Sequence, residues 1–134
     1  MNVYIDTTLS NGFTVSLLDS LKEVDSISVE QVYKEAEELL PSLQLLLSRN
    51  NQEIKNVKEV WVVSGPGRFS ATRIGVAVAN ALCFAASIPM RSIKRNSLQE
   101  TVADHITKFA KARVTKHVEP VYDKAPNITK PTPE

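Results

Sequence analysis

The amino-terminal part of the chain alternates between apolar and polar side chains with a period of two, which predicts β-strands. Residues 2–6 (NVYID) and 13–18 (FTVSLL) are the two clearest runs, and the polar residues 10–12 (SNG) between them suit a hairpin turn. A less regular run at residues 21–27 predicts a third strand. Together the three runs predict an antiparallel meander.

After the third run, the apolar spacing changes to that of a helix. Ser28 and Gln31 have the spacing of a capping box, so the helix is expected to begin there. Pro41 lies inside the pattern and is expected to kink the helix or divide it in two, because proline has no amide proton to donate. The expected apolar face consists of Val32, Ala36, Leu39, Leu40, Leu43, Leu46 and Leu47.

The second half of the chain predicts parallel strands. Residues 59–64 (EVWVVS) are mostly apolar, as in a strand covered on both faces, and a small-residue helix at about 70–87 and a strand at 90–93 follow. Ser97 and Glu100 form a second capping box, and the apolar face of that last helix consists of Leu98, Val102, Ile106 and Phe109. The predicted fold is therefore α/β: a mixed sheet of three antiparallel strands followed by parallel strands, with helices packed on it.

The composition is that of one globular domain with little net charge. The chain has 134 residues, 16 basic and 15 acidic, for a net charge of +1. This balance gives no general electrostatic reason to bind nucleic acid or a membrane. Residues 1–122 are expected to form one lobe, and the proline-rich residues 123–134 an extended tail. The single cysteine, Cys83, excludes an internal disulfide, and the lack of a signal-peptide pattern favours the cytoplasm.

The turn Gly65–Pro66–Gly67 joins a buried strand to a helix, where free amides can hold an anion. The register of a P-loop is missing, as is the third glycine of a dinucleotide site, so a tight turn between buried elements is the simpler interpretation. Arg73 follows in the first turn of the helix, where a cation opposes the helix dipole. Its partner is expected to be a phosphate, a carboxylate of another protein, or a local Asp or Glu.

Other polar residues are weaker candidates. Asp6 and Thr7 end the first strand, where they either organise a metal or phosphate site or merely terminate the strand. His105 and His117 have no partner at metal-ligand spacing and are expected on the solvated surface. Cys83 is expected to be a small buried residue. Neither a metal site nor a set of catalytic residues is therefore predicted.

The small-residue helix is apolar on more than one side. One row of residues at four-residue spacing is Ala71, Gly75 and Ala79, a second is Ala77, Ala81 and Ala85, and Ile74, Val78 and Leu82 lie between them. One row is expected to pack on the chain's own sheet and another to meet a partner. Arg73 and Asn80 interrupt the apolar run, which favours a buried helix over a membrane span.

Three stretches resemble the TsaB (YeaZ) family: IDTT at residues 5–8, EELLPSLQLLL at 37–47, and VSGPGRFSATRIGVAVANALCFAASIPM at 63–90. PVYDKAP at 120–126 resembles the closing segment of that family. The direct matches to the turn-helix motif are Gly65, Pro66, Gly67, Phe69, Arg73, Ile74 and Gly75. The chain departs from the family pattern with Arg68 in place of serine, Ser70–Ala71 in place of Thr-Gly, and Glu35 in place of histidine. The second lobe of typical members is expected to be missing.

The resemblance implies a single actin-like, ribonuclease H-like lobe of the ASKHA superfamily. It implies a non-catalytic scaffold or activator that pairs with the threonylcarbamoyltransferase TsaD in modifying the tRNA adenosine next to the anticodon. The ATPase TsaE would join through that complex, and tRNA would be contacted only indirectly. No cofactor of its own is implied, and ATP or ADP at the partner interface is left open. Apart from the resemblance, a third interpretation is a homodimer of the isolated chain through the same helices.

The expected partner-binding residues are Leu39, Leu43, Leu46, Ala71, Ile74, Gly75, Val78 and Leu82. Some of them must face the sheet, and periodicity alone does not sort them. Gly75→Arg is expected to abolish pairing while the isolated chain stays folded. The alternative function is a small stand-alone domain that binds or hydrolyses a nucleotide; the residues next to a phosphate would be Asp6, Thr7, Gly65, Gly67 and Arg73.

Overall fold

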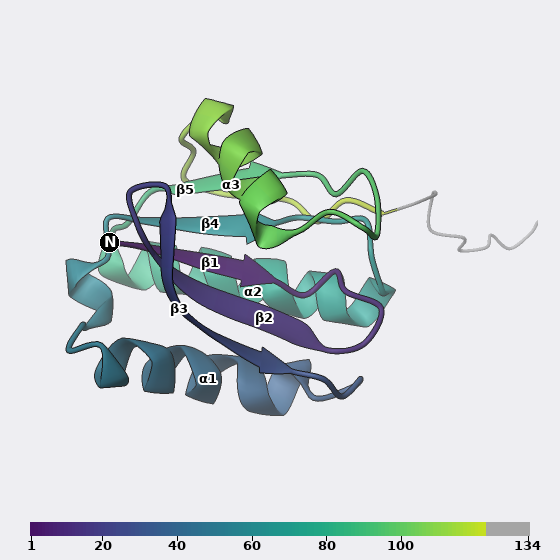
Figure 1. The fold of residues 1–134 in the computed structure, drawn as a ribbon, viewed down its shortest axis with the longest axis horizontal. Helices are drawn as coiled ribbons and strands as arrows, with labels where there is room; N and C mark the ends of the chain where they lie inside the picture. The colour runs from purple at the N-terminus through teal and green to yellow at the C-terminus, as the bar shows by residue number, and fades with distance from the viewer. Residues whose placement is uncertain (123–134) are drawn as a thin grey trace, which may run out of the picture.

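The computed structural model describes residues 1–122, which form one mixed sheet with helices on both faces (Figure 1). The strands are β1 (Asn2–Asp6), β2 (Phe13–Asp19), β3 (Lys22–Val29), β4 (Glu59–Val63) and β5 (Met90–Ile93). The helices are α1 (Glu35–Arg49), α2 (Phe69–Ala86) and α3 (Val102–Lys111), with a short 3₁₀ turn η1 at Ile54–Asn56. The tail predicted for residues 123–134 lies outside the described residues.

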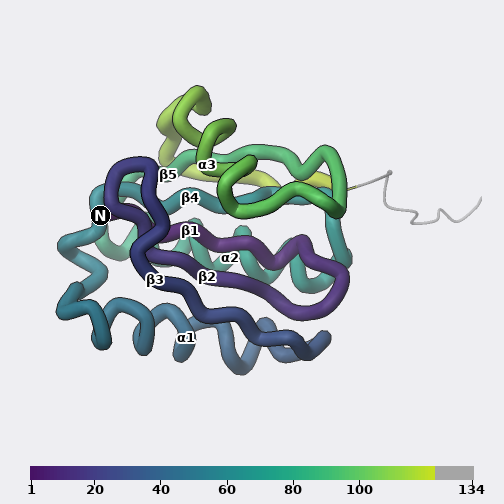
Figure 2. The backbone as a smooth tube through the Cα atoms, viewed as in Figure 1, coloured from purple at the N-terminus to yellow at the C-terminus, as the bar shows by residue number. Residues whose placement is uncertain are grey.

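The strand order is β3-β2-β1-β4-β5, which confirms the predicted α/β sheet. β1, β2 and β3 are antiparallel neighbours, whereas β4 is parallel to β1 and β5 is parallel to β4. Figure 2 follows the backbone from β4 through α2 to β5, the strand–helix–strand crossover that the sequence predicts. Because parallel strands end at the same edge, the turns after β1, β4 and β5 lie near one another.

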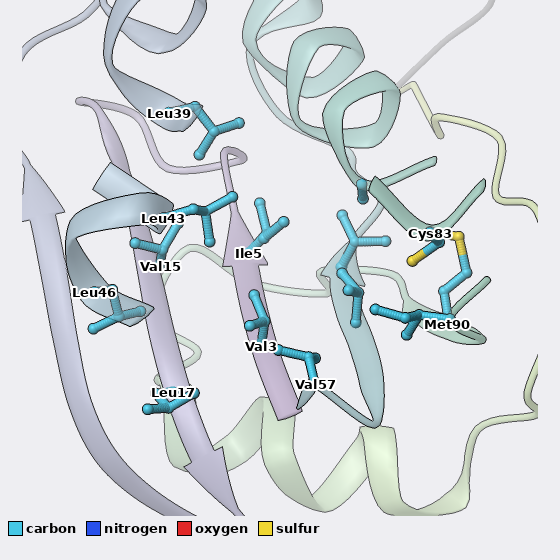
Figure 3. Close-up of a cluster of buried hydrophobic side chains, with 14 of the residues drawn as sticks. Val3, Ile5, Val15, Leu17, Leu39, Leu43, Leu46, Val57, Cys83 and Met90 are labelled. Carbon is cyan, nitrogen blue, oxygen red and sulfur yellow. The ribbon is translucent and has the colours of Figure 1, made fainter. Parts of the chain in front are cut away.

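The larger core lies between the sheet and the two helices α1 and α2. Figure 3 shows Leu39, Leu43 and Leu46 of α1 over the sheet residues, which include Val3, Ile5, Val15 and Leu17. These sheet residues alternate along β1 and β2, as a strand with a period of two requires. Burying each such aliphatic side chain contributes roughly 1.5–3 kcal/mol, so this face supplies most of the apolar stabilisation.

A smaller aromatic core lies on the opposite face under α3. Trp61 of β4 stacks on Phe109 with ring centroids 5.1 Å apart, and Tyr4 of β1 meets Phe109 edge to ring at 6.0 Å. Ile106 and Phe109 are buried on the inner side of α3, as predicted. The predicted member Leu98 is exposed and precedes the helix.

The predicted helix starts are wrong for α1 and α3. Ser28 lies in β3, where its hydroxyl bonds the hydroxyl of Thr14 on β2 at 2.8 Å. α1 begins only at Glu35 and runs unbroken through Pro41, so the proline does not divide it. The capping box of α3 is formed by Thr101 and Asp104, four residues after the predicted one.

Candidate functional site

α2 presents two different surfaces, an inner one in the core and an outer one in solvent. The buried residues are Ala71, Thr72, Gly75, Val76, Ala79 and Cys83. Gly75 permits the closest approach, because a Cβ there would lie 3.0 Å from Cβ of Thr7 and closer still to its Oγ1 and Cγ2. The row predicted to pack on the sheet is therefore the row of Ala71, Gly75 and Ala79.

The second surface is the outer face of α2, which we define as the exposed residues Phe69, Ser70, Arg73, Ala77, Ala81 and Phe84. Phe84 has 89% of its surface exposed. Ile74, Val78 and Leu82 are half-buried along one flank and contact the larger core. On α1, Leu40 is 43% exposed. This is an apolar surface that no described residue covers.

α2 is also the only helix among residues 1–122 that is long and apolar enough to cross a membrane, with a mean hydropathy of 1.4. Length and composition alone are weak evidence, since a core helix passes the same test. Contacts of α2 with β1 and β4 account for the apolar residues of its inner side. These contacts do not explain why most residues of the outer face are apolar.

Burial corrects the predicted partner-binding set. Five of its members are buried within the chain and so are unavailable to a partner: Leu39, Leu43, Leu46, Ala71 and Gly75. Only Ile74, Val78 and Leu82 reach the surface. The expectation for Gly75→Arg is wrong for the same reason, because an arginine there would displace Thr7 and disturb the fold.

A hollow of about 460 Å³ opens between the beginnings of α1 and α2. Its lining includes Tyr33, Ala36, Phe69 and Ile74. Ala36 is on α1 and Ile74 on α2, and Leu40 lies one turn after Ala36 on the same side of α1. The two helices thus border a shallow apolar groove beside the outer face of α2.

The two charged departures from the family pattern pair with each other at the floor of this hollow. Arg68 Nη2 lies 2.5 Å from Glu35 Oε2, and Glu35 is 2% exposed. The same guanidinium donates to the backbone carbonyls of Leu9 and Gly12 at 2.9 and 2.8 Å. Arg68 and Glu35 therefore tie the β1–β2 turn, α1 and α2 together, which neither residue alone would suggest.

Asp6 is fully engaged inside the protein. Its Oδ2 forms a buried ion pair with Arg95 Nη2 at 2.5 Å, and its Oδ1 accepts from the backbone amide of Thr8 at 2.8 Å. Arg95 Nε also donates to Thr8 Oγ1 at 2.7 Å. Sequence reasoning missed Arg95, which is the second of two basic residues after strand β5, and nothing in that pattern distinguishes it from Lys94.

The predicted surface position of His105 is wrong. The side chain is completely buried, with Nδ1 2.8 Å from the Tyr4 hydroxyl and Nε2 3.1 Å from Glu100 Oε1. Asp6 Oδ2 lies 4.0 Å from Nδ1. His105 thus connects Tyr4 and Asp6 of β1 to helix α3. His117 is exposed, as predicted, and Cys83 is buried, as predicted.

Burial and hydrogen bonds shift the pKa values of His105 and its neighbours. Desolvation is the largest cause that lowers the pKa of His105, against the opposing charge of Asp6 and the hydrogen bond to Glu100. Desolvation also raises the pKa of Tyr4 far above its ordinary value. At Glu100 desolvation acts upward but is outweighed by hydrogen bonds from Lys108, the Asn96 amide and His105, which lower the pKa to about 2.

Stability is expected to fall as the pH drops through the range in which free histidine titrates. Because folding lowers the pKa of His105, the unfolded chain takes up the proton first, so the stability is full above the ordinary value of 6.5 and declines below it. We expect His105→Gln to remove this decline between about pH 7.5 and 5.5. Urea unfolding of both proteins at the two pH values measures it. Equal pH dependence in the two proteins would contradict the assignment.

The residues predicted next to a phosphate are only partly brought together. Gly65 has a φ of +127° and lies against the backbone of Val121, and Gly67 lies against Thr8. The buried hydroxyl of Thr7 has no hydrogen-bond partner among the described residues. Arg73 lies apart on the outer face of α2. Within residues 1–122 there is also no group of three His, Cys, Asp or Glu side chains that could hold a metal ion.

Comparisons with known proteins give matches described as TsaD, TsaB and YeaZ. Residues 32–114 match the family described as "TsaD: tRNA N6-adenosine threonylcarbamoyltransferase". The chain is 30% identical over 70 residues to the tRNA threonylcarbamoyladenosine biosynthesis protein TsaB of Buchnera aphidicola, covering 52% of this chain and 32% of that protein.

Two solved structures share the fold. YeaZ from Pseudomonas aeruginosa has a TM-score of 0.64 and 26% identity, with 69% of this chain and 43% of that chain covered. A second structure, a protein from Pseudomonas aeruginosa described as similar to peptidase YeaZ, has the same score and identity, with 69% and 42% covered. The chain thus spans less than half the length of each of these relatives.

Proposed function

The chain belongs to the family described as TsaD, which residues 32–114 match, and it is similar to TsaB and YeaZ proteins, so we propose that it is a non-catalytic scaffold or activator that pairs with a TsaD threonylcarbamoyltransferase. In this proposal the pair modifies the tRNA adenosine next to the anticodon in the cytoplasm. The transfer itself takes place on TsaD. The present chain supplies a surface that holds TsaD in its active arrangement.

The observation that carries the proposal is the uncovered outer face of α2. Its inner side already fills the core, so the exposed Phe84, Ala77 and Ala81 have no role in packing within residues 1–122. An exposed apolar face beside a groove is typical of a protein interface. A standard interface buries roughly 800 Å² on each partner, an area that two adjacent helices can supply.

Two further partners belong to the proposal. TsaE joins through the complex, and tRNA is contacted indirectly, in keeping with the net charge of +1. We propose no cofactor for this chain alone, and any ATP or ADP would be shared at the junction with TsaD. An isolated chain would pair with a second copy through the same face, since an uncovered apolar surface favours self-association.

The alternative, a stand-alone nucleotide-binding or hydrolysing domain, has less support. Such a site would use the carboxylate of Asp6, but both of its oxygens already bond to Arg95 and Thr8. The Thr7 hydroxyl lies against Gly75. Calorimetry of the isolated chain with ATP and magnesium separates the two functions, because the scaffold is expected to give no heat of binding above buffer.

Replacing Ala77 with arginine is expected to weaken binding to TsaD at least about 30-fold, because a large charged side chain would stand between packed helices. Ala77 is exposed on α2, so the variant should fold normally. Isothermal titration of purified TsaD measures the affinity, and a tRNA modification assay measures the activity of the mixture.

The matched control is Ala110→Arg, an exposed alanine on α3, on the opposite face of the sheet. It should bind TsaD as the wild type does and support the same modification. Equal loss of affinity in both variants, or no loss in either, would count against the outer face of α2 as the interface.

A further inference from the structure

Arg73 is one of two arginines in the described residues that pair with no carboxylate there, and the other is Arg113. Arg49, Arg68, Arg91 and Arg95 each form an ion pair with a carboxylate. Arg73 has no carboxylate within 4.0 Å in residues 1–122, so the local partner considered for it is absent there. Its guanidinium carbon instead lies 5.2 Å from the centroid of the Phe69 ring.

The aromatic contact holds this cation in place at the surface. Phe69 is itself stacked on Tyr122, with ring centroids 4.6 Å apart and an angle of 25° between the planes. A guanidinium over a fixed ring is positioned, yet it keeps its charge and most of its donors for another group. Arg73 is therefore a preorganised cation with donors to spare.

Two mostly apolar hollows lie on the groove side of Arg73. The hollow of about 460 Å³ reaches Phe69, Ser70 and Ile74. A shallower one of about 290 Å³ is lined by Ser70, Arg73, Ile74 and Ala77, so the two share Ser70 and Ile74. In protein interfaces, the residues that contribute most to the binding free energy are often arginines and aromatic residues in well-packed surroundings of this kind.

We infer that these hollows seat one helix of the partner, which places a large apolar side chain between Tyr33, Ala36 and Ile74 and an Asp or Glu carboxylate on Arg73. The inference rests on the proposed function and names the chemistry of the partner surface. The charge of Arg73 complements a carboxylate, and the apolar flanks complement a helix.

A protein carboxylate fits this surface better than a phosphate. Phosphate groups are held by several converging donors, whereas Arg73 is the one cation lining the two hollows that has no carboxylate partner within residues 1–122. Arg68, the other cation there, is paired with Glu35, and the nearby Lys34 is paired with Glu37. One free guanidinium in apolar surroundings matches one carboxylate on a protein.

The test is the affinity of full-length variants for TsaD by isothermal titration, without nucleotide and at two salt concentrations. Arg73→Glu is expected to weaken binding at least about 100-fold, since two carboxylates would then face each other. Arg73→Lys, which keeps the charge but loses the bidentate geometry, should lose less. The control is Arg113→Glu, an exposed arginine outside the two hollows, which should stay within about 2-fold of the wild type.

A charge-reversal scan of the partner identifies the carboxylate. One Asp→Lys or Glu→Lys variant of TsaD should regain at least about 10-fold in affinity for Arg73→Glu. Wild-type affinity in Arg73→Glu, or the lack of any restoring TsaD variant, would overturn the inference. If the wild-type chain does not bind TsaD at all, the proposed function itself fails, so the two failures are distinguishable.

Discussion

Arg95→Met is expected to lower the free energy of unfolding by about 3–5 kcal/mol, because it leaves the buried carboxylate of Asp6 without its counter-charge. Asp6 and Arg95 are both almost completely buried and lie 2.5 Å apart. Arg95 also donates to Thr8 Oγ1 and to the carbonyl of Ser97 at 3.0 Å. Its loss would release the turn after β1 from the segment that leads to α3. Urea unfolding at pH 7.5 measures the effect.

The control for this prediction is the double replacement Asp6→Asn with Arg95→Met. It removes both charges, so it should be more stable than Arg95→Met alone, by the coupling expected of a buried pair. If Arg95→Met loses less than about 1 kcal/mol, the pair lies in a more solvated environment than the structure gives it.

Gly75→Arg is expected to prevent stable folding. For Gly75→Ala, overpacking should cost about 1–3 kcal/mol of folding free energy, and the higher helix propensity of alanine should offset about 1 kcal/mol of that cost. The cause is local, since a Cβ at this position would overlap the side chain of Thr7. Circular dichroism reports whether the arginine variant folds, and urea unfolding ranks the alanine variant.

Shortening Thr7 provides the matched test of that contact. The hydroxyl of Thr7 is buried without a hydrogen-bond partner among the described residues, so Thr7→Ala should cost little by itself. Combined with Gly75→Ala it removes the two closest atoms and should recover most of the lost stability. Purely additive effects of the two replacements would show that Thr7 does not limit the approach of α2.

Much of the fold could be predicted because each strand is specified by the pattern of its own residues. β1 and β2 alternate with a period of two, and β4 is apolar after Glu59 because it is covered on both faces. The first residues of the helices were harder to predict. Ser28 and Gln31 have the spacing of a capping box, but the Ser28 hydroxyl bonds Thr14 across the sheet, a contact that sequence spacing does not reveal.

The buried polar cluster of Tyr4, Asp6, Arg95 and His105 could not be predicted, because these residues are distant from one another in the sequence. His105 bonds Tyr4 across a separation of 101 residues, and Arg95 reaches Asp6 across 89. A search for partners at metal-ligand spacing cannot find such contacts. The helical period did carry one signal, because His105 lies one turn before Phe109 on the face that α3 buries.

The predicted partner-binding residues lie on α1 and α2, but most of them are on the sides that the sheet buries. α2 is apolar around most of its circumference, so periodicity does not tell the core side from the outer side. The sheet decides, since Gly75 must face Thr7 while Ala77 and Phe84 turn outward. The position of Arg73 on the outward side then indicates the chemistry of the proposed partner.

The most direct test of the proposed pairing is sedimentation velocity of this chain mixed with TsaD. The wild type and Ala110→Arg are expected to form one heavier species with the mass of the mixed complex, whereas Ala77→Arg should sediment as separate proteins. The contradicting result is a wild-type chain that keeps its own sedimentation coefficient at micromolar concentrations of TsaD.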